Sequence, residues 1–259
     1  PANSTAQTLP FSQNWSDANL ITTNDNWNNV PGIIGYRGDD PAFTGTGIDP
    51  QTITADLSAT LVNVTANQTN PNTLTAGGIA EFAISDPVVA LQGSGTRPAP
   101  HLLINLNTTA STGIVVSYNL RDIDGAADNA VQPVALQYRV GGSGGYTNLP
   151  GAFVADASSG PNLATLVTPV SVTLPAACEN QSLVQLRIIT ANAVNSDEWI
   201  GIDDISVIAG GGTSVPSGIG SATPNNPNAG DAVLLTVTVA PGSNPTSTNL
   251  AVETDLTNI

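Results

Sequence analysis

Alternation of apolar and polar residues with a period of two runs through most of this chain, while helical periodicity is nearly absent. Successive side chains of a β-strand point to opposite faces, so each run predicts a strand with one buried and one solvent-facing side. The clearest runs are residues 114–120, 134–140, 170–174, 184–188 and 233–239, with shorter candidates at 79–84, 88–92 and 102–106. Turn-forming Gly, Pro, Asn and Asp residues separate them. We predict an all-β fold, a β-sandwich or jelly roll.

Two segments interrupt the strand pattern. Residues 56–78 are rich in Thr, Asn and Ala and carry few large side chains, which predicts a long surface loop or an irregular insertion. Further on, the run Gly210-Gly211-Gly212 has the composition of a flexible joint. We therefore expect a jelly-roll β-sandwich over residues 1–209, a Gly-rich linker over 210–216 and a short partial Ig-like β module over 217–259.

The last segment is too short to close into a sandwich of its own. It offers one strand at residues 232–240 and a second possible strand at 249–254. A seven-strand Ig sandwich takes about 100 residues, and about three strands leave sheet edges open. Either the chain is a fragment, or a neighbouring copy or another chain completes the module, as in a homo-oligomer or filament that shares the C-terminal strands.

Charge and composition exclude several classes of function. The 259 residues include five Arg, no Lys and 20 acidic residues, so the formal net charge is −15. Such a chain cannot neutralise a run of phosphates, which argues against nucleic-acid binding, and anionic membrane surfaces repel it. No apolar stretch approaches the ~20 residues that span a bilayer. The single Cys178 excludes an internal disulfide, and the lack of Lys excludes Schiff-base chemistry.

Two adjacent carboxylates, Asp203 and Asp204, stand in the otherwise apolar run 198–207. Unpaired carboxylates are costly to bury, and five Arg cannot offset 20 acidic side chains. A hard divalent cation takes several carboxylate and carbonyl oxygens at once and is therefore the partner that we expect. The alternative is that both Asp side chains point into water at the end of a strand.

Several landmarks resemble the secreted jelly-roll domains of the lectin-like and MAM-like kind. They are the closing run Trp199-Ile200-Gly201-Ile202-Asp203-Asp204-Ile205, the run Gly35-Tyr36-Arg37-Gly38-Asp39-Asp40, Trp27, and residues 11–15, 120–125 and 134–140. More closely, residues 8–209 look like a module at the front of large bacterial extracellular proteins, some of which carry endonuclease/exonuclease/phosphatase-type domains further along. In related jelly rolls a calcium ion ties the first strands to the last one. The resemblance thus points to Asp204 together with Asp39 or Asp40.

The chain departs from any nuclease in its catalytic residues. One His, four Glu and no Lys leave no nuclease set, so the resemblance implies a fold and not an activity. The sequence opens without a signal pattern, as in a cytosolic protein or a secreted chain whose signal has been removed. From the resemblance we expect a secreted, extracellular or cell-surface location.

A second candidate metal site is the run Asp122-Ile123-Asp124-Gly125-Ala126-Ala127-Asp128. Asp122, Asp124 and Asp128 with a turn-permitting Gly have the composition to wrap oxygens around calcium, although the spacing is not that of an EF-hand loop. The alternative is an acidic hairpin loop with Asx turns.

Aromatic residues make up only 4% of the chain, so we expect most of them in the core. Tyr146 follows Gly144-Gly145 and is the aromatic side chain that we expect to be exposed and to contact a glycan. His101 precedes a predicted strand with no nucleophile near it, and we interpret it as a strand-start residue.

The sequence therefore predicts a non-catalytic extracellular module. The main hypothesis is a structural or adhesive cell-surface component stabilised by calcium. The alternatives are a glycan-binding accessory domain of a larger secreted enzyme, and a subunit of a filament or surface layer completed by strand sharing with a neighbouring copy or surface protein.

Overall fold

The computed structural model describes residues 2–126, 130–210, 216–241 and 250–253. The chain divides into two compact units, Pro1–Ala209 and Gly210–Ile259. The described residues contain no helix long and apolar enough to cross a membrane. The predicted linker lies mostly outside the described residues.

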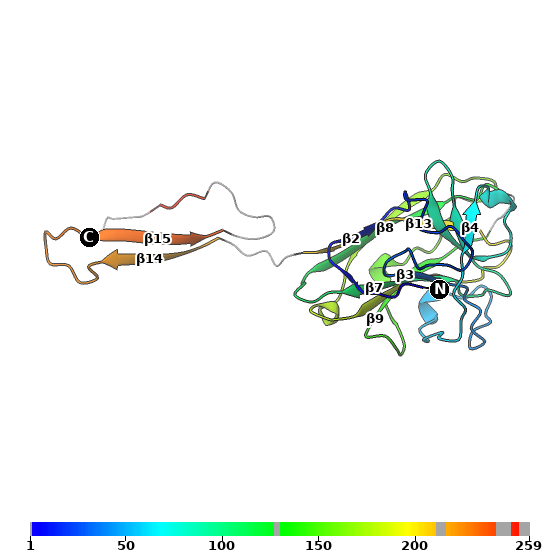
Figure 1. Ribbon diagram of the computed structural model, residues 1–259, viewed down its shortest axis with the longest axis horizontal. Helices are drawn as coiled ribbons and strands as arrows, with labels where there is room; N and C mark the ends of the chain where they lie inside the picture. Colours follow the sequence, from blue (N-terminus) through cyan, green and yellow to red (C-terminus); the bar gives the residue numbers. More distant parts are fainter. Residues whose placement is uncertain (1, 127–129, 211–215, 242–249, 254–259) are drawn as a thin grey trace. The chain divides into compact units, whose positions relative to one another are not determined.

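The first unit is a sandwich of two β-sheets (Figure 1). The first sheet has the order β1-β7-β12-β9-β10, with β3 also paired to β7. Its strands are β1 (Gln7–Thr8), β3 (Ile33–Tyr36), β7 (His101–Asn107), β9 (Val134–Val140), β10 (Thr147–Asn148) and β12 (Val184–Thr190). The predicted all-β sandwich is confirmed.

The second sheet has the order β11-β8-β13-β6-β5-β4, with β2 also paired to β13. Its strands are β2 (Phe11–Gln13), β4 (Thr65–Gln68), β5 (Gly78–Phe82), β6 (Val88–Gln92), β8 (Ile114–Asp122), β11 (Val167–Thr173) and β13 (Ile200–Ala209). Short 3₁₀ turns connect some of the strands of the two sheets, namely η1 (Pro50–Thr52), η2 (Pro71–Thr73), η3 (Pro150–Ala152) and η4 (Ala176–Cys178).

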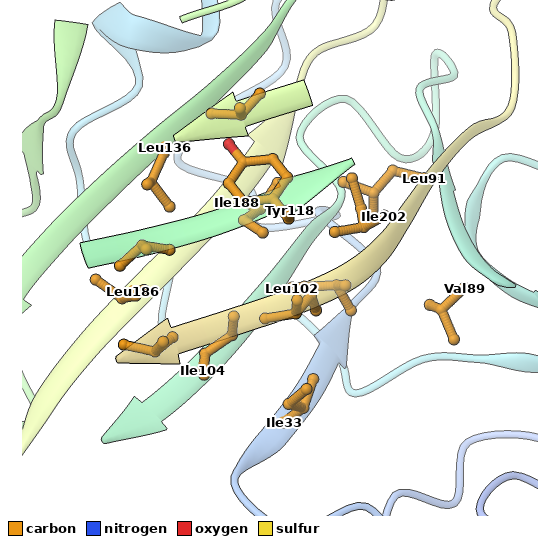
Figure 2. Close-up of a cluster of buried hydrophobic side chains, with 14 of the residues drawn as sticks. Ile33, Val89, Leu91, Leu102, Ile104, Tyr118, Leu136, Leu186, Ile188 and Ile202 are labelled. Carbon is orange, nitrogen blue, oxygen red and sulfur yellow. The ribbon is translucent and has the colours of Figure 1, made fainter. Parts of the chain in front are cut away.

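The core lies between the two sheets, where every second residue of each strand points inward. Figure 2 shows Leu102, Leu136 and Ile188 of the first sheet among Leu91, Tyr118 and Ile202 of the second. All of these side chains are almost fully buried. The period-two pattern therefore places one face of each sheet in the core. The opposite, outer face of the first sheet carries the alternate residues of its strands.

Tyr118 brings a polar atom into this core. Its side chain is 2% exposed, and among the described residues its hydroxyl has no hydrogen-bond partner. A buried polar group without a partner costs about 1–3 kcal/mol. Tyr118→Phe is therefore expected to raise the free energy of unfolding by about 1 kcal/mol, measured by urea denaturation. Tyr138→Phe removes the hydroxyl of a half-buried ring and should change little; a less stable Tyr118→Phe variant would contradict the prediction.

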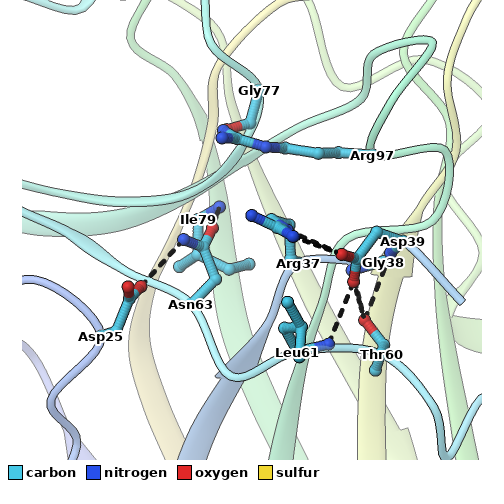
Figure 3. Close-up of polar contacts among 10 residues, drawn as sticks. All are labelled: Asp25, Arg37, Gly38, Asp39, Thr60, Leu61, Asn63, Gly77, Ile79 and Arg97. Carbon is cyan, nitrogen blue, oxygen red and sulfur yellow. Dashed lines mark hydrogen bonds and ion pairs between the residues drawn. The ribbon is translucent and has the colours of Figure 1, made fainter.

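Of the two alternatives that the sequence leaves open for residues 56–78, the structure shows an irregular insertion rather than a long surface loop. Thr65–Gln68 forms β4, which pairs in parallel with β5, and Val64 is fully buried. Asn63 supplies hydrogen bonds that a strand backbone would otherwise make, because its Oδ1 accepts from the Ile79 N–H (3.0 Å) and its Nδ2 donates to Asp25 (3.0 Å) (Figure 3). The polar residues that suggested a loop are thus part of the packed structure.

The second unit contains an antiparallel hairpin of β14 (Ser217–Thr223) and β15 (Leu234–Ala240). The predicted strand at 232–240 is present as β15 and pairs with β14. Of the second possible strand at 249–254, residues 250–253 are not a strand, and residues 249 and 254 lie outside the described residues. The Gly- and Ser-rich sequence of β14 carries little strand signal. Large apolar side chains on the hairpin are exposed, among them Ile219 (78%) and Leu234 (67%). An isolated two-stranded hairpin is at best marginally stable in water.

Candidate functional site

The carboxylate of Asp39, one of the predicted calcium ligands, is already surrounded by protein donors (Figure 3). Its Oδ2 accepts from Arg37 Nη2 at 2.6 Å, and its Oδ1 accepts from Thr60 Oγ1 and the Leu61 N–H, both at 3.0 Å. Partial burial acts to raise the pKa of Asp39, but the bonds from Leu61, Arg37 and Thr60 hold it below its ordinary value. Arg37-Gly38-Asp39 is thus a self-paired turn.

The neighbouring Asp40 is buried and makes backbone contacts of its own. Its two carboxylate oxygens accept from the N–H groups of Ala42 and Ala59, each at 2.8 Å. Asp40 therefore fastens the segment after β3 to the segment near residue 59.

The Asp203-Asp204 pair forms a β-bulge in β13. Two residues lie between Asp203 and Ser206, whereas only one lies between their partners Asn119 and Ser117 in β8. The extra residue, Asp204, has φ of +48° and an exposed side chain, and it lets Ile205 return to the core after Ile202.

Arg121 of β8 neutralises Asp203, which is buried. Arg121 Nη1 lies 2.6 Å from Asp203 Oδ2 and 3.0 Å from the carboxylate of Asp86. Burial raises the pKa of Asp203, against the bonds from the Asp204 N–H and Arg121 that lower it. Arg121 is therefore a protein counter-ion for the Asp203 carboxylate. Asp204, for its part, accepts from Asn119 Nδ2 at 3.0 Å.

Asp39, Asp40 and Asp204 each have protein hydrogen-bond donors, and a calcium ion joining Asp204 to Asp39 or Asp40 stays a prediction. No group of three or more His, Cys, Asp or Glu side chains able to hold a metal ion occurs in the parts of the chain that the structure describes. Arg121 pairs with the buried carboxylate of Asp203, and backbone N–H groups donate to Asp39 and Asp40, so these carboxylates have partners within the protein.

The Asp122 loop shows the Asx turns of the alternative interpretation. Asp122 Oδ2 accepts from the N–H and the hydroxyl of Ser159 (2.7 and 2.6 Å), and its Oδ1 accepts from the Asp124 N–H at 3.2 Å. Asp124 accepts in turn from the Ala126 N–H at 3.1 Å. Burial raises the pKa of Asp122, more than the Ser159 and Asp124 bonds lower it. The third predicted ligand, Asp128, lies outside the described residues, so calcium in this loop stays a prediction.

Tyr146 is buried rather than exposed, which corrects the sequence-based expectation. Its side chain is 6% exposed, and its ring lies 3.8 Å from Arg187 Cζ and 4.4 Å from Arg139 Cζ. Burial raises the pKa of Tyr146 to about 12, although both guanidinium groups act to lower it. The two Gly before Tyr146 suggested an open turn, but cation–π contacts fold the ring against the first sheet.

These Arg side chains belong to a polar ladder on the outer face of the first sheet. Asn105 of β7, Gln185 of β12 and Arg139 of β9 are register partners across three neighbouring strands. Gln185 Nε2 donates to Asn105 Oδ1 at 2.7 Å, and Arg139 Nε donates to Gln185 Oε1 at 2.6 Å. The ladder gives the outer face a fixed row of planar polar groups.

The segment around η1 is held over this face by the two Arg. Arg187 Nη1 and Nη2 donate to the carbonyls of Ala55 (2.9 Å) and Ile53 (2.5 Å), and Arg139 Nη1 contacts the carboxylate of Asp56. The segment therefore forms a wall beside the ladder rather than a free loop.

Between the wall and the ladder lies a cavity of about 220 Å³, which we call the sheet cleft. Its lining includes Tyr36, Asp56, His101, Arg139, Tyr146 and Gln185. The volume is below the roughly 300–1,000 Å³ of pockets that enclose a drug-sized ligand, so the sheet cleft suits one ring-sized unit of a longer ligand.

One side of the sheet cleft is a stacked pair of rings. Tyr36 of β3 lies over His101 of β7 with centroids 5.3 Å apart and an interplanar angle of 26°. His101 Nδ1 is 2.9 Å from the Ala99 carbonyl, so we assign the ring proton to Nδ1 and the lone pair to Nε2. Burial, and then the positive charge of Arg187, lower the pKa of His101 to about 3, against the Ala99 bond. His101 is therefore uncharged at neutral pH.

Sequence reasoning missed most of this site. It correctly placed His101 at a strand start and named Tyr146, which lines the cleft, as a glycan contact, but it assigned no binding role to Asp56, Arg139 or Gln185. The available signal was the type of residue at the polar positions of three predicted strands. These positions, 101 and 105, 137 and 139, and 185 and 187, carry His, Asn, Gln or Arg. A strand that faces only solvent does not require such planar hydrogen-bonding side chains.

No protein-family model and no curated protein matches the chain. Among solved structures, similar folds include a carbohydrate-binding module, CBM28, specific for non-crystalline cellulose (12% identity, TM-score 0.38, covering 56% of this chain and 98% of that chain). Others are the K3 cleaved adhesin domain of Lys-gingipain from Porphyromonas gingivalis (12%, 0.36, 48% and 75%) and a cyclase from Fischerella sp. TAU (15%, 0.38, 72% and 85%). At such identities and TM-scores, these similarities do not indicate what the sheet cleft binds.

Proposed function

We propose that this chain is a non-catalytic module that binds a carbohydrate in the sheet cleft, as part of a secreted or cell-surface protein. The observation that carries the proposal is the stacked Tyr36–His101 pair beside Arg139, Gln185 and Asp56 in one cavity. A sugar ring offers C–H faces to an aromatic ring and hydroxyls that both donate and accept. The sheet cleft supplies guanidinium donors, a carboxylate acceptor and an amide that does both.

The same residues are poorly suited to catalysis. Asp56 is the one carboxylate among the cleft-lining residues that the structure describes, and it is paired with Arg139. Glycoside hydrolysis needs two carboxyl groups on opposite sides of the bond. His101, with a pKa of about 3, is too weakly basic to accept a proton near neutral pH.

Binding is expected to depend on the ring of Tyr36. Tyr36→Ala should weaken affinity for the bound polysaccharide at least ~10-fold, because it removes the surface on which a sugar ring packs. Tyr36→Phe keeps that surface and should retain most of the affinity. Affinity electrophoresis against a panel of soluble neutral and acidic polysaccharides checks both variants. Equal binding by wild type and Tyr36→Ala would place the glycan site elsewhere.

The exposed apolar side chains of the β14–β15 hairpin favour a second role, strand sharing with a neighbouring copy or another chain. Adding strands would cover side chains such as Ile219 and Leu234 and pair the open hairpin edges. Mass photometry of the full chain over a range of concentrations tests pairing with a second copy, and monomers throughout would argue against it.

Calcium stabilisation is kept as a proposal, both for the Asp122 loop and for Asp204 with Asp39 or Asp40. If an ion binds at either place, adding a chelator should lower the melting temperature by several degrees, since a ligand that binds only the folded state stabilises it. Thermal melts with EDTA, and with EDTA plus excess calcium, make the comparison. Identical melts would remove calcium from this chain.

A further inference from the structure

The sheet cleft is locally rich in positive charge, although the chain as a whole carries −15. Two of the five Arg, Arg139 and Arg187, lie against the same ring, that of Tyr146. Arg139 is paired with Asp56, whereas Arg187 has no carboxylate within ion-pair distance among the described residues. Two guanidinium groups thus face one carboxylate.

Arg187 illustrates how unusual this charge is. Its side chain is fully buried, and its three hydrogen bonds go to uncharged oxygens, those of Gln137, Ala55 and Ile53. By contrast, Arg121 lies between two carboxylates, those of Asp86 and Asp203. A buried charge is costly without a counter-charge, so an anion in the neighbouring cleft would be favoured.

Arg139 provides the contact point for such an anion. Its Nε donates to Gln185, and its Nη1 contacts Asp56 and the Gly144 carbonyl. Within the described residues its Nη2 makes no hydrogen bond, and Arg139, which is 9% exposed, lines the sheet cleft. Hydrogen bonds from a guanidinium to a carboxylate are roughly twice as strong as those between neutral groups.

The overall negative charge of the chain does not outweigh this local excess. At physiological ionic strength the Debye length is about 8 Å, so exposed carboxylates farther away are largely screened. Groups that are buried against the ligand are screened much less. The nearest fixed charges, two positive and one negative, therefore decide which ligands the sheet cleft accepts.

Building on the carbohydrate binding proposed above, we propose that the sheet cleft is specific for sugars that carry a carboxylate, with the carboxylate on Arg139 Nη2 and the sugar ring against Tyr36. The ligand class is therefore a uronic acid or a polysaccharide that contains one. A neutral sugar would leave the Arg139 donor without a charged partner.

The test uses a matched pair of polymers, polygalacturonate and its fully methyl-esterified form, which differ in the free carboxylate. Isothermal titration calorimetry with the full chain is expected to show at least ~10-fold weaker binding of the ester. A sulfated polymer and a neutral xylan complete the panel. Tighter binding of the sulfated polymer than of polygalacturonate, or equal binding of acid and ester, would overturn carboxylate specificity and leave carbohydrate binding standing. Absence of any binding that depends on Tyr36 would overturn carbohydrate binding itself.

Two variants probe the charges directly. Arg139→Gln should remove the preference for polygalacturonate over the ester, and its melting curve shows whether it still folds. Asp56→Asn changes a side chain that is 33% exposed and removes the competing negative charge, so it should raise the ratio of polygalacturonate affinity to ester affinity about 2–5-fold. A lower ratio for Asp56→Asn than for wild type, in a folded protein, would contradict the proposal even if Arg139→Gln fails to fold.

Discussion

Replacing Gly38 by Ala is expected to lower the free energy of unfolding by about 3 kcal/mol or more. Gly38 has φ of +74°, a conformation that costs residues with a Cβ about 1–2 kcal/mol. An added Cβ would lie 2.1 Å from the carbonyl carbon of Ala99 and 2.3 Å from its oxygen. Because both atoms belong to the backbone, relief requires a shift of the chain, and overpacking of this kind typically costs about 1–3 kcal/mol.

The expected damage extends to the sheet cleft. The Gly38 carbonyl accepts from the Ala99 N–H at 3.1 Å, and the Ala99 carbonyl is the acceptor for His101 Nδ1. A shift of Ala99 therefore moves the ring on which Tyr36 stacks, so any residual folded protein should also bind its ligand more weakly.

Gly95→Ala is the matched control for this substitution. No atom lies within 4 Å of its Cβ position, and its φ is outside the left-handed region. Urea denaturation should show a change within about 0.5 kcal/mol for Gly95→Ala. Similar stabilities for the two variants would mean that the Gly38 corner is looser than its contacts indicate.

The sequence predicts the core well and the outer face poorly, for a physical reason. Burial imposes a strict alternation, which is visible in runs such as 134–140 and 184–188, and these become β9 and β12. The ladder of Asn105, Gln185 and Arg139 depends on which strands become neighbours. That pairing brings together positions up to 80 residues apart in the chain, and periodicity carries no information about it.

Carboxylate neutralisation shows the same limit. The ratio of five Arg to 20 acidic residues suggested that metal ions were needed, but net composition ignores where each Arg lies. Arg121 and Asp203 are diagonal neighbours on adjacent strands, and their pairing follows from the register of β8 and β13. The bulge has a sequence signal, because the buried apolar residues change from even positions (200 and 202) to odd positions (205 and 207), which requires one extra residue in the strand.

Acidification from pH 7.5 to 5.0 is expected to remove about 2 kcal/mol of stability through His101 alone. In the folded chain the pKa of His101 is about 3, because of burial and then the charge of Arg187. In the unfolded chain it returns to about 6.5. Between these values the unfolded state binds a proton that the folded state does not, so stability is present above about pH 6.5 and falls as the pH drops toward 3.

The comparison of wild type with His101→Asn isolates this contribution. Asn keeps an amide N–H for the Ala99 carbonyl but does not titrate, and His101 is the only His in the chain. Burial also raises the pKa of Glu81 and Asp122, which opposes acid destabilisation, but both carboxylates are unchanged in the variant and cancel from the difference. Between pH 7.5 and 5.0 we expect the wild type to lose about 2 kcal/mol more of its free energy of unfolding than His101→Asn loses. Parallel pH profiles would show that the pKa of His101 is the same in the folded and the unfolded chain, and the ring would then gain its proton within the folded protein between pH 7.5 and 5.0.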